Sequence, residues 1–129
     1  MGFASVALEL LAVSAMSFEK STKDPTRAQE RVLFKYLKRN KDTEYARKYG
    51  AASVKSVAEF RSRFPVVKYE DVRPYVDRMA KGEKDILTSD EVIFFGITSG
   101  TTGTPKLIPV TKYSQSKKAA LMSLWAYYI

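Results

Sequence analysis

Apolar residues recur at the spacing of one helix face along much of the first two-thirds of the chain. The opening segment shows this spacing and predicts a helix with one buried stripe. After a polar break, Asp24 and Pro25 suit the N-cap and first turn of a second helix, which should end near Asn40. The positions that define the opening stripe are Phe3, Val6, Ala7, Leu10, Leu11 and Ser14.

Capping residues predict two shorter helices after Asn40. Thr43 can cap a helix that runs through Tyr49, with Gly50 as its stop. Ser56 and Glu59 have the spacing of a capping box, in which each side chain accepts a backbone N–H at the helix start. The proline that follows the next apolar residues should end this helix.

Residues 69–80 predict a further helix, which Gly82 should terminate. Pro74 is compatible with it only in the first turn, because proline has no N–H to donate inside a helix. The apolar face of this helix consists of Val72, Tyr75, Val76 and Met79.

The pattern changes to strands near the C-terminal end. Residues 92–98 form a nearly continuous apolar run, typical of a strand covered on both faces, and residues 106–111 predict a second strand. Two strands joined by a short loop predict a β-hairpin. A last apolar stripe at Ala120, Leu121, Leu124, Trp125 and Tyr128 predicts a helix that reaches Ile129 without a C-cap, so we expect this helix to be interrupted there.

The predicted fold class is therefore α/β, in the form of an α+β fragment: N-terminal helices, a hairpin that carries a Ser/Thr/Gly loop, and a helix. A lone hairpin is marginal in water, so we expect it to need further partners for its apolar faces.

Composition narrows the chemistry. The 129 residues include no Cys and no His, which excludes disulfides, thiolate metal sites and hydrolysis by a Ser/His pair. The net charge of +8 attracts polyanions, including nucleic acids, anionic membranes and nucleotides. Basic residues between Lys20 and Lys48 are mixed with acidic ones, and no nucleic-acid module is recognisable. This pattern favours solvated helix surfaces over a nucleic-acid partner.

The N-terminal segment does not fit a secretion signal, because it lacks a basic start and Glu9 interrupts its apolar stretch. No other segment approaches the roughly 20 apolar residues of a membrane span. We therefore predict a cytoplasmic protein without a membrane partner.

The segment between the two predicted strands has the residue types of a phosphate-binding loop. Its glycines allow positive φ and close approach of the backbone to a ligand, its hydroxyls donate hydrogen bonds, and its lysine supplies a mobile cation. It fits neither a Walker loop nor a dinucleotide fingerprint. The alternative is a hydroxyl-rich turn without a ligand. The segment reads Thr98, Ser99, Gly100, Thr101, Thr102, Gly103, Thr104, Pro105 and Lys106.

The string SGTTG-x-PK resembles the first signature of the adenylate-forming superfamily, whose loop holds the β- and γ-phosphates of ATP. Flanking stretches are similar to the auxin-responsive Gretchen Hagen family of acyl-acid amido synthetases. These stretches lie at residues 43–50, 64–66, 69–75, 82–83, 86–88 and 108–111.

The resemblance implies that residues 1–129 form the N-terminal part of the large N-terminal domain of an ATP-dependent, AMP-forming ligase. In such an enzyme, ATP and a small carboxylic acid form an acyl adenylate, and an amine, usually of an amino acid, then displaces AMP. Mg²⁺ would offset the phosphate charge. The resemblance assigns the turn to Thr98 and phosphate contacts to Ser99, Gly100, Thr101, Thr102, Gly103 and Lys106. It assigns no catalytic residue or metal ligand to this chain.

The favoured interpretation is an N-terminal portion that is inactive by itself, and two alternatives remain. One is a stand-alone phosphate- or nucleotide-binding module. The other is half of a split enzyme that pairs with a separate downstream fragment.

Overall fold

The computed structural model describes residues 3–98 and 105–129, with side chains from residue 12 onward. The described chain is mostly helical and contains one two-stranded antiparallel sheet. Its elements are α1 (Phe3–Thr22), α2 (Pro25–Asn40), α3 (Glu44–Lys48), the 3-10 turn η1 (Ala51–Ser53), α4 (Val57–Arg63), α5 (Tyr69–Ala80), β1 (Val92–Thr98), β2 (Lys106–Thr111) and α6 (Lys112–Tyr128). The predicted order of helices, hairpin and helix is confirmed. Of the predicted α/β class, the described residues show a mainly helical structure with one hairpin.

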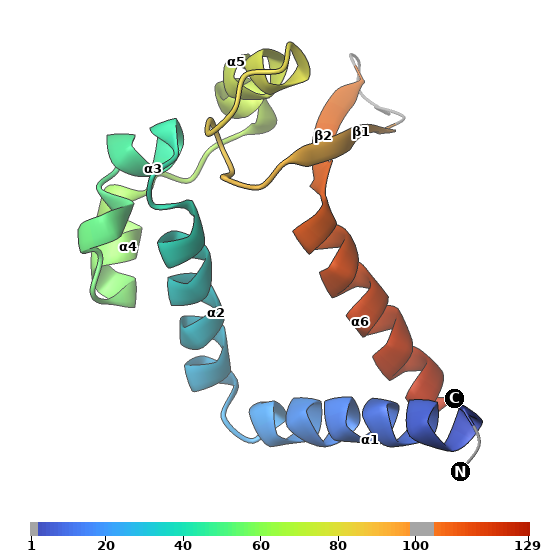
Figure 1. Ribbon diagram of the computed structural model, residues 1–129. Helices are drawn as coiled ribbons and strands as arrows, with labels where there is room; N and C mark the ends of the chain where they lie inside the picture. The colour runs from blue at the N-terminus through green and yellow to red at the C-terminus, as the bar shows by residue number, and fades with distance from the viewer. Residues whose placement is uncertain (1–2, 99–104) are drawn as a thin grey trace.

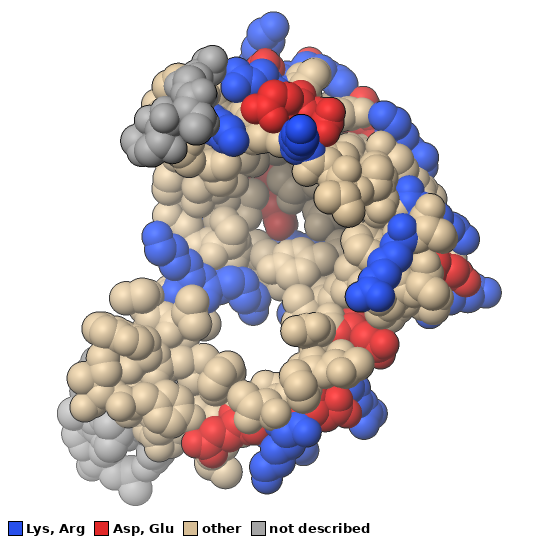
Figure 2. All heavy atoms as spheres, turned by 180° about the vertical axis from the view of Figure 1, so that it is seen from behind, with Lys and Arg blue, Asp and Glu red and all other residues tan. Residues whose placement is uncertain are grey.

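The helices form an open frame (Figure 1). Helix α1 forms its base, and α2 and α6 rise from opposite ends of α1. Helix α4 lies beside α2, and α3, α5 and the hairpin lie at the far end. Contacts of α1 with both α2 and α6 close the base. The space-filling view shows an opening between these helices (Figure 2). The three long helices α1, α2 and α6 therefore contact one another near their ends rather than along their lengths.

Local capping explains where the helices begin. The Asp24 carboxylate accepts the Arg27 N–H at 3.0 Å, and Pro25 occupies the first helical position. The Thr43 hydroxyl accepts the Ala46 N–H at 3.2 Å. These predicted N-caps are confirmed.

Other start and stop predictions are confirmed at glycine and serine. The Ser56 hydroxyl accepts the Glu59 N–H at 3.1 Å, as predicted. Gly50 adopts a φ of 67° between α3 and η1, and Gly82 adopts a φ of 94° after α5. Such left-handed backbone strains any residue with a Cβ, which explains glycine at both helix ends.

Two details of the sequence prediction are wrong. The Glu59 carboxylate accepts the N–H of Lys55 at 2.9 Å rather than that of Ser56, so the capping box closes one residue earlier. Pro74 is the sixth residue of α5 and lies beyond its first turn. The helix tolerates this proline because the carbonyl that loses its partner belongs to Glu70, which is exposed to water.

A small core lies within residues 24–90, which we call the helical unit. Two backbone hydrogen bonds join the start of α3 to the segment after α5: Glu44 N–H to Asp85 C=O at 2.8 Å and Tyr45 N–H to Ile86 C=O at 3.1 Å. The buried side chains of the unit are Thr43, Ala46, Ala51, Val54, Val76, Met79 and Ile86. This core positions α5, on which the hairpin rests.

The hairpin and α6, which we call the hairpin arm, are much less buried. The strand prediction of cover on both faces is wrong within the described chain: Phe94 is 48% exposed and Ile97 is 72% exposed. The physical reason is that the hairpin has only α5 and α6 as its main neighbours, and neither covers a full face. The stripe of α6 is exposed as well, with Trp125 at 63%.

Helix α1 continues through Thr22, past the segment where the opening stripe was recognised. Among its described side chains Ala15 is buried, whereas Ser14, a predicted stripe position, is exposed. The stripe positions from Phe3 to Leu11 lie outside the described side chains.

Candidate functional site

The hairpin brings the two ends of the predicted phosphate loop together. Thr98 is the last residue of β1 and Lys106 the first of β2, and they are direct partners in the antiparallel register. Directly opposed residues project to the same face, with Cβ atoms typically about 5 Å apart. The hydroxyl of Thr98 and the ammonium of Lys106 therefore flank the base of the loop. The residues between them that were predicted to bind phosphate, Ser99, Gly100, Thr101, Thr102 and Gly103, lie outside the described residues.

Tyr69, the first residue of α5, fixes the start of β2. Its phenolic hydroxyl accepts the Leu107 N–H at 2.9 Å and donates to the Leu107 carbonyl at 3.1 Å. Because both backbone groups of Leu107 bond to Tyr69, they face away from β1. Sequence analysis missed this contact, since it joins residues that are 38 positions apart.

Two cations lie against the ring of Tyr69. Lys106 Nζ is 5.4 Å and Arg73 Cζ is 5.1 Å from the ring centroid, within the range of cation–π attraction. None of the ion pairs among the described residues includes either cation. Positive charge at the base of the loop is therefore not neutralised by a neighbouring carboxylate. Residues 69–75 had marked the family resemblance, but no sequence signal indicated that Arg73 and Lys106 contact the same aromatic ring.

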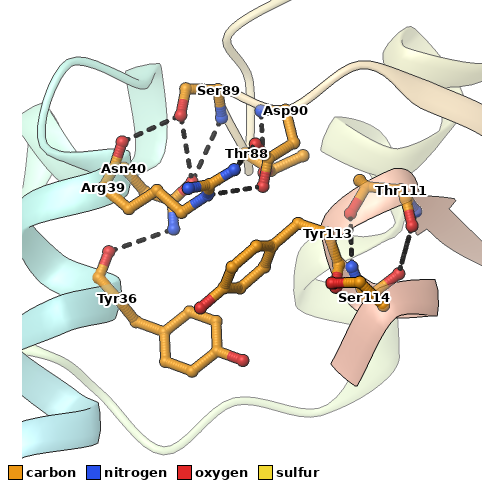
Figure 3. Close-up of polar contacts among 10 residues, drawn as sticks. Tyr36, Arg39, Asn40, Thr88, Ser89, Asp90, Thr111, Tyr113 and Ser114 are labelled. Atoms are coloured by element: carbon orange, nitrogen blue, oxygen red, sulfur yellow. Dashed lines mark hydrogen bonds and ion pairs between the residues drawn. The ribbon is translucent and has the colours of Figure 1, made fainter. Parts of the chain in front are cut away.

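A polar cluster fixes the other end of the hairpin to the helical unit (Figure 3). The Arg39 guanidinium, from the end of α2, forms an ion pair with the carboxylate of Asp90, just before β1. The hydrogen bond to Asp90 raises the pKa of Arg39 above its usual range. Ser89 adds a hydrogen bond from its hydroxyl to the Arg39 carbonyl at 2.8 Å and one from its N–H to Asn40 Oδ1 at 3.1 Å.

The start of α6 contacts the same cluster. The Arg39 guanidinium carbon lies 4.0 Å from the centroid of the Tyr113 ring, and Tyr36 meets this ring edge-on at 6.0 Å (Figure 3). Thr111 caps α6 by accepting the Ser114 N–H at 3.1 Å, and the Ser114 hydroxyl accepts the Thr111 N–H at 2.9 Å. The two strands are thus held at β1 by Arg39 and at β2 by Tyr69 and the α6 cap.

The donors around the hairpin fit an anion better than a metal ion. A threonine hydroxyl, a lysine and an arginine donate hydrogen bonds or carry positive charge, whereas metal sites need carboxylate or other electron-pair donors. Across residues 3–98 and 105–129, no cluster of three or more acidic residues has the arrangement of a metal site. Within the same ranges no helix combines the length and the apolar character needed to cross a bilayer.

The structure and the sequence of the chain both match known proteins. A solved structure of the GH3.15 acyl acid amido synthetase matches the chain with a TM-score of 0.72 and 34% sequence identity, over 84% of this chain and 19% of that one. Residues 14–129 match the model of the GH3 family N-terminal domain. The chain therefore belongs to the GH3 family, and the predicted family resemblance is confirmed.

Curated relatives support the same assignment. The chain is 36% identical over 115 residues to indole-3-acetic acid-amido synthetase GH3.2 of Arabidopsis thaliana, covering 87% of this chain and 21% of that protein. It is 38% identical over 108 residues to indole-3-acetic acid-amido synthetase GH3.8 of Oryza sativa subsp. indica, covering 82% of this chain and 18% of that protein. The chain spans about a fifth of the length of such relatives.

Proposed function

We propose that this chain supplies the polyphosphate-binding loop of an ATP-dependent, AMP-forming acyl-acid amido synthetase and is inactive by itself. The supporting observation is the pairing of Thr98 with Lys106 across the base of the loop, in a chain that matches the GH3 N-terminal domain. On this proposal, residues 1–129 are the first part of the large N-terminal domain of a cytoplasmic enzyme.

In the proposed site, Lys106 and the loop residues from Ser99 to Gly103 bind the β- and γ-phosphates of ATP, and Thr98 shapes the turn. Binding of the outer phosphates leaves the α-phosphate accessible to a carboxylate. It also stabilises the negative charge that develops on the leaving pyrophosphate. Mg²⁺ accompanying ATP would neutralise part of this charge. The attacking carboxylate displaces pyrophosphate to give an acyl adenylate, whose AMP is then displaced by an amine.

The relatives indicate only the chemical class of the substrates. These relatives are named indole-3-acetic acid-amido synthetases, so we propose a small carboxylic acid and an amino acid as the two substrates. Adenylation requires the acid, the α-phosphate and the metal to be held in line. The described residues offer cations and hydroxyls for the outer phosphates, so the remaining groups must come from other parts of a complete enzyme.

A chimera tests the proposal. Residues 14–129 replace the matching segment of the GH3.15 acyl acid amido synthetase, and ATP–pyrophosphate exchange is measured with the acid substrate of that enzyme. We expect acid-dependent exchange from the chimera and none from the 129-residue chain alone. Robust exchange by the chain alone would show that it is a complete catalyst. Absence of exchange in a folded chimera would overturn the proposed function.

Lys106→Ala in this chimera tests the phosphate assignment. Loss of one charge-assisted contact to the transferring phosphates should lower the exchange rate by about tenfold to a hundredfold. Lys117→Ala is the matched control, because Lys117 lies on α6 beside Tyr113, at 5.1 Å from its ring centroid. Equal rates for Lys106→Ala and the unaltered chimera would remove the phosphate role of Lys106.

The exposed apolar residues of the hairpin arm favour a second possibility, that the chain is half of a split enzyme. Ile97 is 72% exposed and Leu121 is 63% exposed, and burial of such side chains would stabilise a complex with a downstream fragment. Mixing the chain with a GH3.15 segment that lacks the matching residues should then give a monodisperse heterodimer with exchange activity. A stable monomer that binds ATP tightly by itself would instead indicate a stand-alone module.

A further inference from the structure

Tyr69 joins a rigid helix start to the point where the loop enters β2. Asp71 accepts the N–H of Lys68 at 2.8 Å, which fixes the first turn of α5 and therefore the backbone of Tyr69. The half-buried Tyr69 side chain then bonds to both backbone groups of Leu107, at 2.9 and 3.1 Å. The residue immediately before Leu107 is Lys106, the first residue of β2, so the start of α5 fixes the backbone position of this lysine.

The ring of Tyr69 also acts on the lysine side chain. Lys106 Nζ lies 5.4 Å from the ring centroid, and Arg73 Cζ lies 5.1 Å from it. A free lysine side chain samples many rotamers and loses that freedom when it binds an anion. A ring that already holds the ammonium reduces this loss. Arg73 is a second cation against the same ring and adds to the positive charge around it.

We propose that Tyr69 is a positioning residue of the phosphate loop, which fixes the backbone at Leu107 through its hydroxyl and pre-orients the Lys106 ammonium through its ring. This inference rests on the proposed function, because it assumes that Lys106 binds polyphosphate. Two variants separate the two roles of the Tyr69 side chain. Tyr69→Phe removes the hydroxyl and keeps the ring, whereas Tyr69→Leu removes both.

Tyr75 provides a matched control on the same helix. Its hydroxyl accepts a hydrogen bond from Lys48 at 3.1 Å, and the Lys48 ammonium lies 5.7 Å from its ring centroid. Tyr75 thus also holds a lysine, but one of α3 rather than of the hairpin. A loss of phosphate affinity that came only from damage to α5 would occur in Tyr75→Leu as well as in Tyr69→Leu.

The experiment uses the full chain and inorganic triphosphate, a probe for the phosphate chain of ATP, at constant ionic strength. Binding is followed by NMR through the amides of residues 98–107, and the ε-methylene protons of Lys106 report its distance from the aromatic ring. We expect Tyr69→Leu to raise the Kd about threefold to tenfold and Tyr69→Phe about twofold. The ring-current shift of Lys106 should persist in Tyr69→Phe and disappear in Tyr69→Leu.

Two further results complete the test. In a chain that already carries Lys106→Ala, Tyr69→Leu should add no more than the twofold effect of Tyr69→Phe, because the ring acts through that lysine and only the hydroxyl contact with Leu107 is left to lose. Tyr75→Leu should leave the Kd unchanged, and protection of the α5 amides from exchange should verify that each variant is folded.

Three outcomes would overturn the inference. One is an unchanged Kd in a folded Tyr69→Leu variant, and another is equal loss in Tyr75→Leu; both leave the proposed function intact. The third is absence of triphosphate binding by the unaltered chain, which removes the affinity that Tyr69 is proposed to tune. Exchange by the chimera, measured separately, then still decides the proposed function.

Discussion

The helical unit and the hairpin arm differ in how far their apolar side chains are buried. Residues 24–90 contain most of the buried side chains of the described structure, and capping hydrogen bonds fix the starts of their helices. The hairpin arm has Thr111 as its buried residue and exposes a series of large apolar side chains: Ile93, Phe94, Ile97, Ile108, Leu121, Met122, Trp125, Tyr127, Tyr128 and Ile129. The uncharged area where α6 meets α1 is visible in Figure 2.

This difference teaches that the two regions depend on different interactions. The helical unit buries its small core against itself, so its stability should respond to changes within the unit. The hairpin arm keeps its position through a few anchors, chiefly Tyr69 at β2 and Arg39 with Asp90 before β1. Its apolar faces gain little from the described chain, because apolar surface contributes only when it is removed from water.

The largest effect should come from truncating a methionine in the core of the helical unit. Met79 is 6% exposed, so Met79→Ala should lower the free energy of unfolding by about 2–4 kcal/mol through lost burial and a cavity. Met122→Ala in α6 is the control: this residue is 53% exposed, and its truncation should cost at most about 0.5 kcal/mol. Urea unfolding followed by far-UV circular dichroism measures both, and equal losses would contradict the comparison.

The next effect should distinguish the two buried capping threonines. Thr43 is 1% exposed and Thr111 is 6% exposed. Thr43→Val removes the hydroxyl that accepts the Ala46 N–H and donates to the Asn40 carbonyl, and should cost about 1–2 kcal/mol. Thr111→Val should cost about 0.5–1 kcal/mol. Hydrogen exchange should show the first loss across α3 and the second only in α6; a loss spread over both regions in each variant would refute their independence.

The ion pair of Glu44 with Arg78 should make the helical unit sensitive to acid. Arg78 donates to both carboxylate oxygens of Glu44, at 2.9 and 2.8 Å, and these hydrogen bonds hold the pKa of Glu44 below its ordinary value of 4.5. A lowered pKa stabilises the folded state above the unfolded-state value, and this contribution is lost as the pH falls through the folded-state pKa. Stability should therefore fall with pH in this acid range.

Glu44→Gln tests this assignment. The variant should have a lower urea midpoint than the unaltered chain at neutral pH. The difference should shrink as the pH falls below 4.5 and through the lowered folded-state pKa, where Glu44 loses its charge. A difference that stays constant through the acid range would mean that the charge of Glu44 does not contribute.

The smallest effect on stability should come from the exposed face of α6. Trp125 is 63% exposed, so Trp125→Ser should change the free energy of unfolding by no more than about 0.5 kcal/mol. It should instead reduce self-association in sedimentation velocity, because an exposed indole favours non-specific contacts. Lys117→Ser on the same helix is the control for self-association. A Trp125→Ser variant destabilised by more than about 1 kcal/mol would show that this face is covered in solution.

Sequence alone determined the features that depend on near neighbours in the chain. The caps at Asp24, Thr43 and Ser56 and the glycine at position 50 follow from backbone N–H groups within three residues or from local φ, so their chemistry can be recognised in a short string. The hairpin was predictable for the same reason, since β-favouring runs flank a loop of turn residues. The family was recognisable because its signature is continuous in the chain.

Only the tertiary structure decided what meets across long separations. It placed Tyr69 on Leu107, and Arg39 on Asp90, which is 51 residues away. It allowed Pro74 inside α5, and it left β1 exposed although its composition predicts a covered strand. Such outcomes depend on which surfaces pack together and which remain in water, and a local pattern of residues carries no information about the neighbour that will cover it.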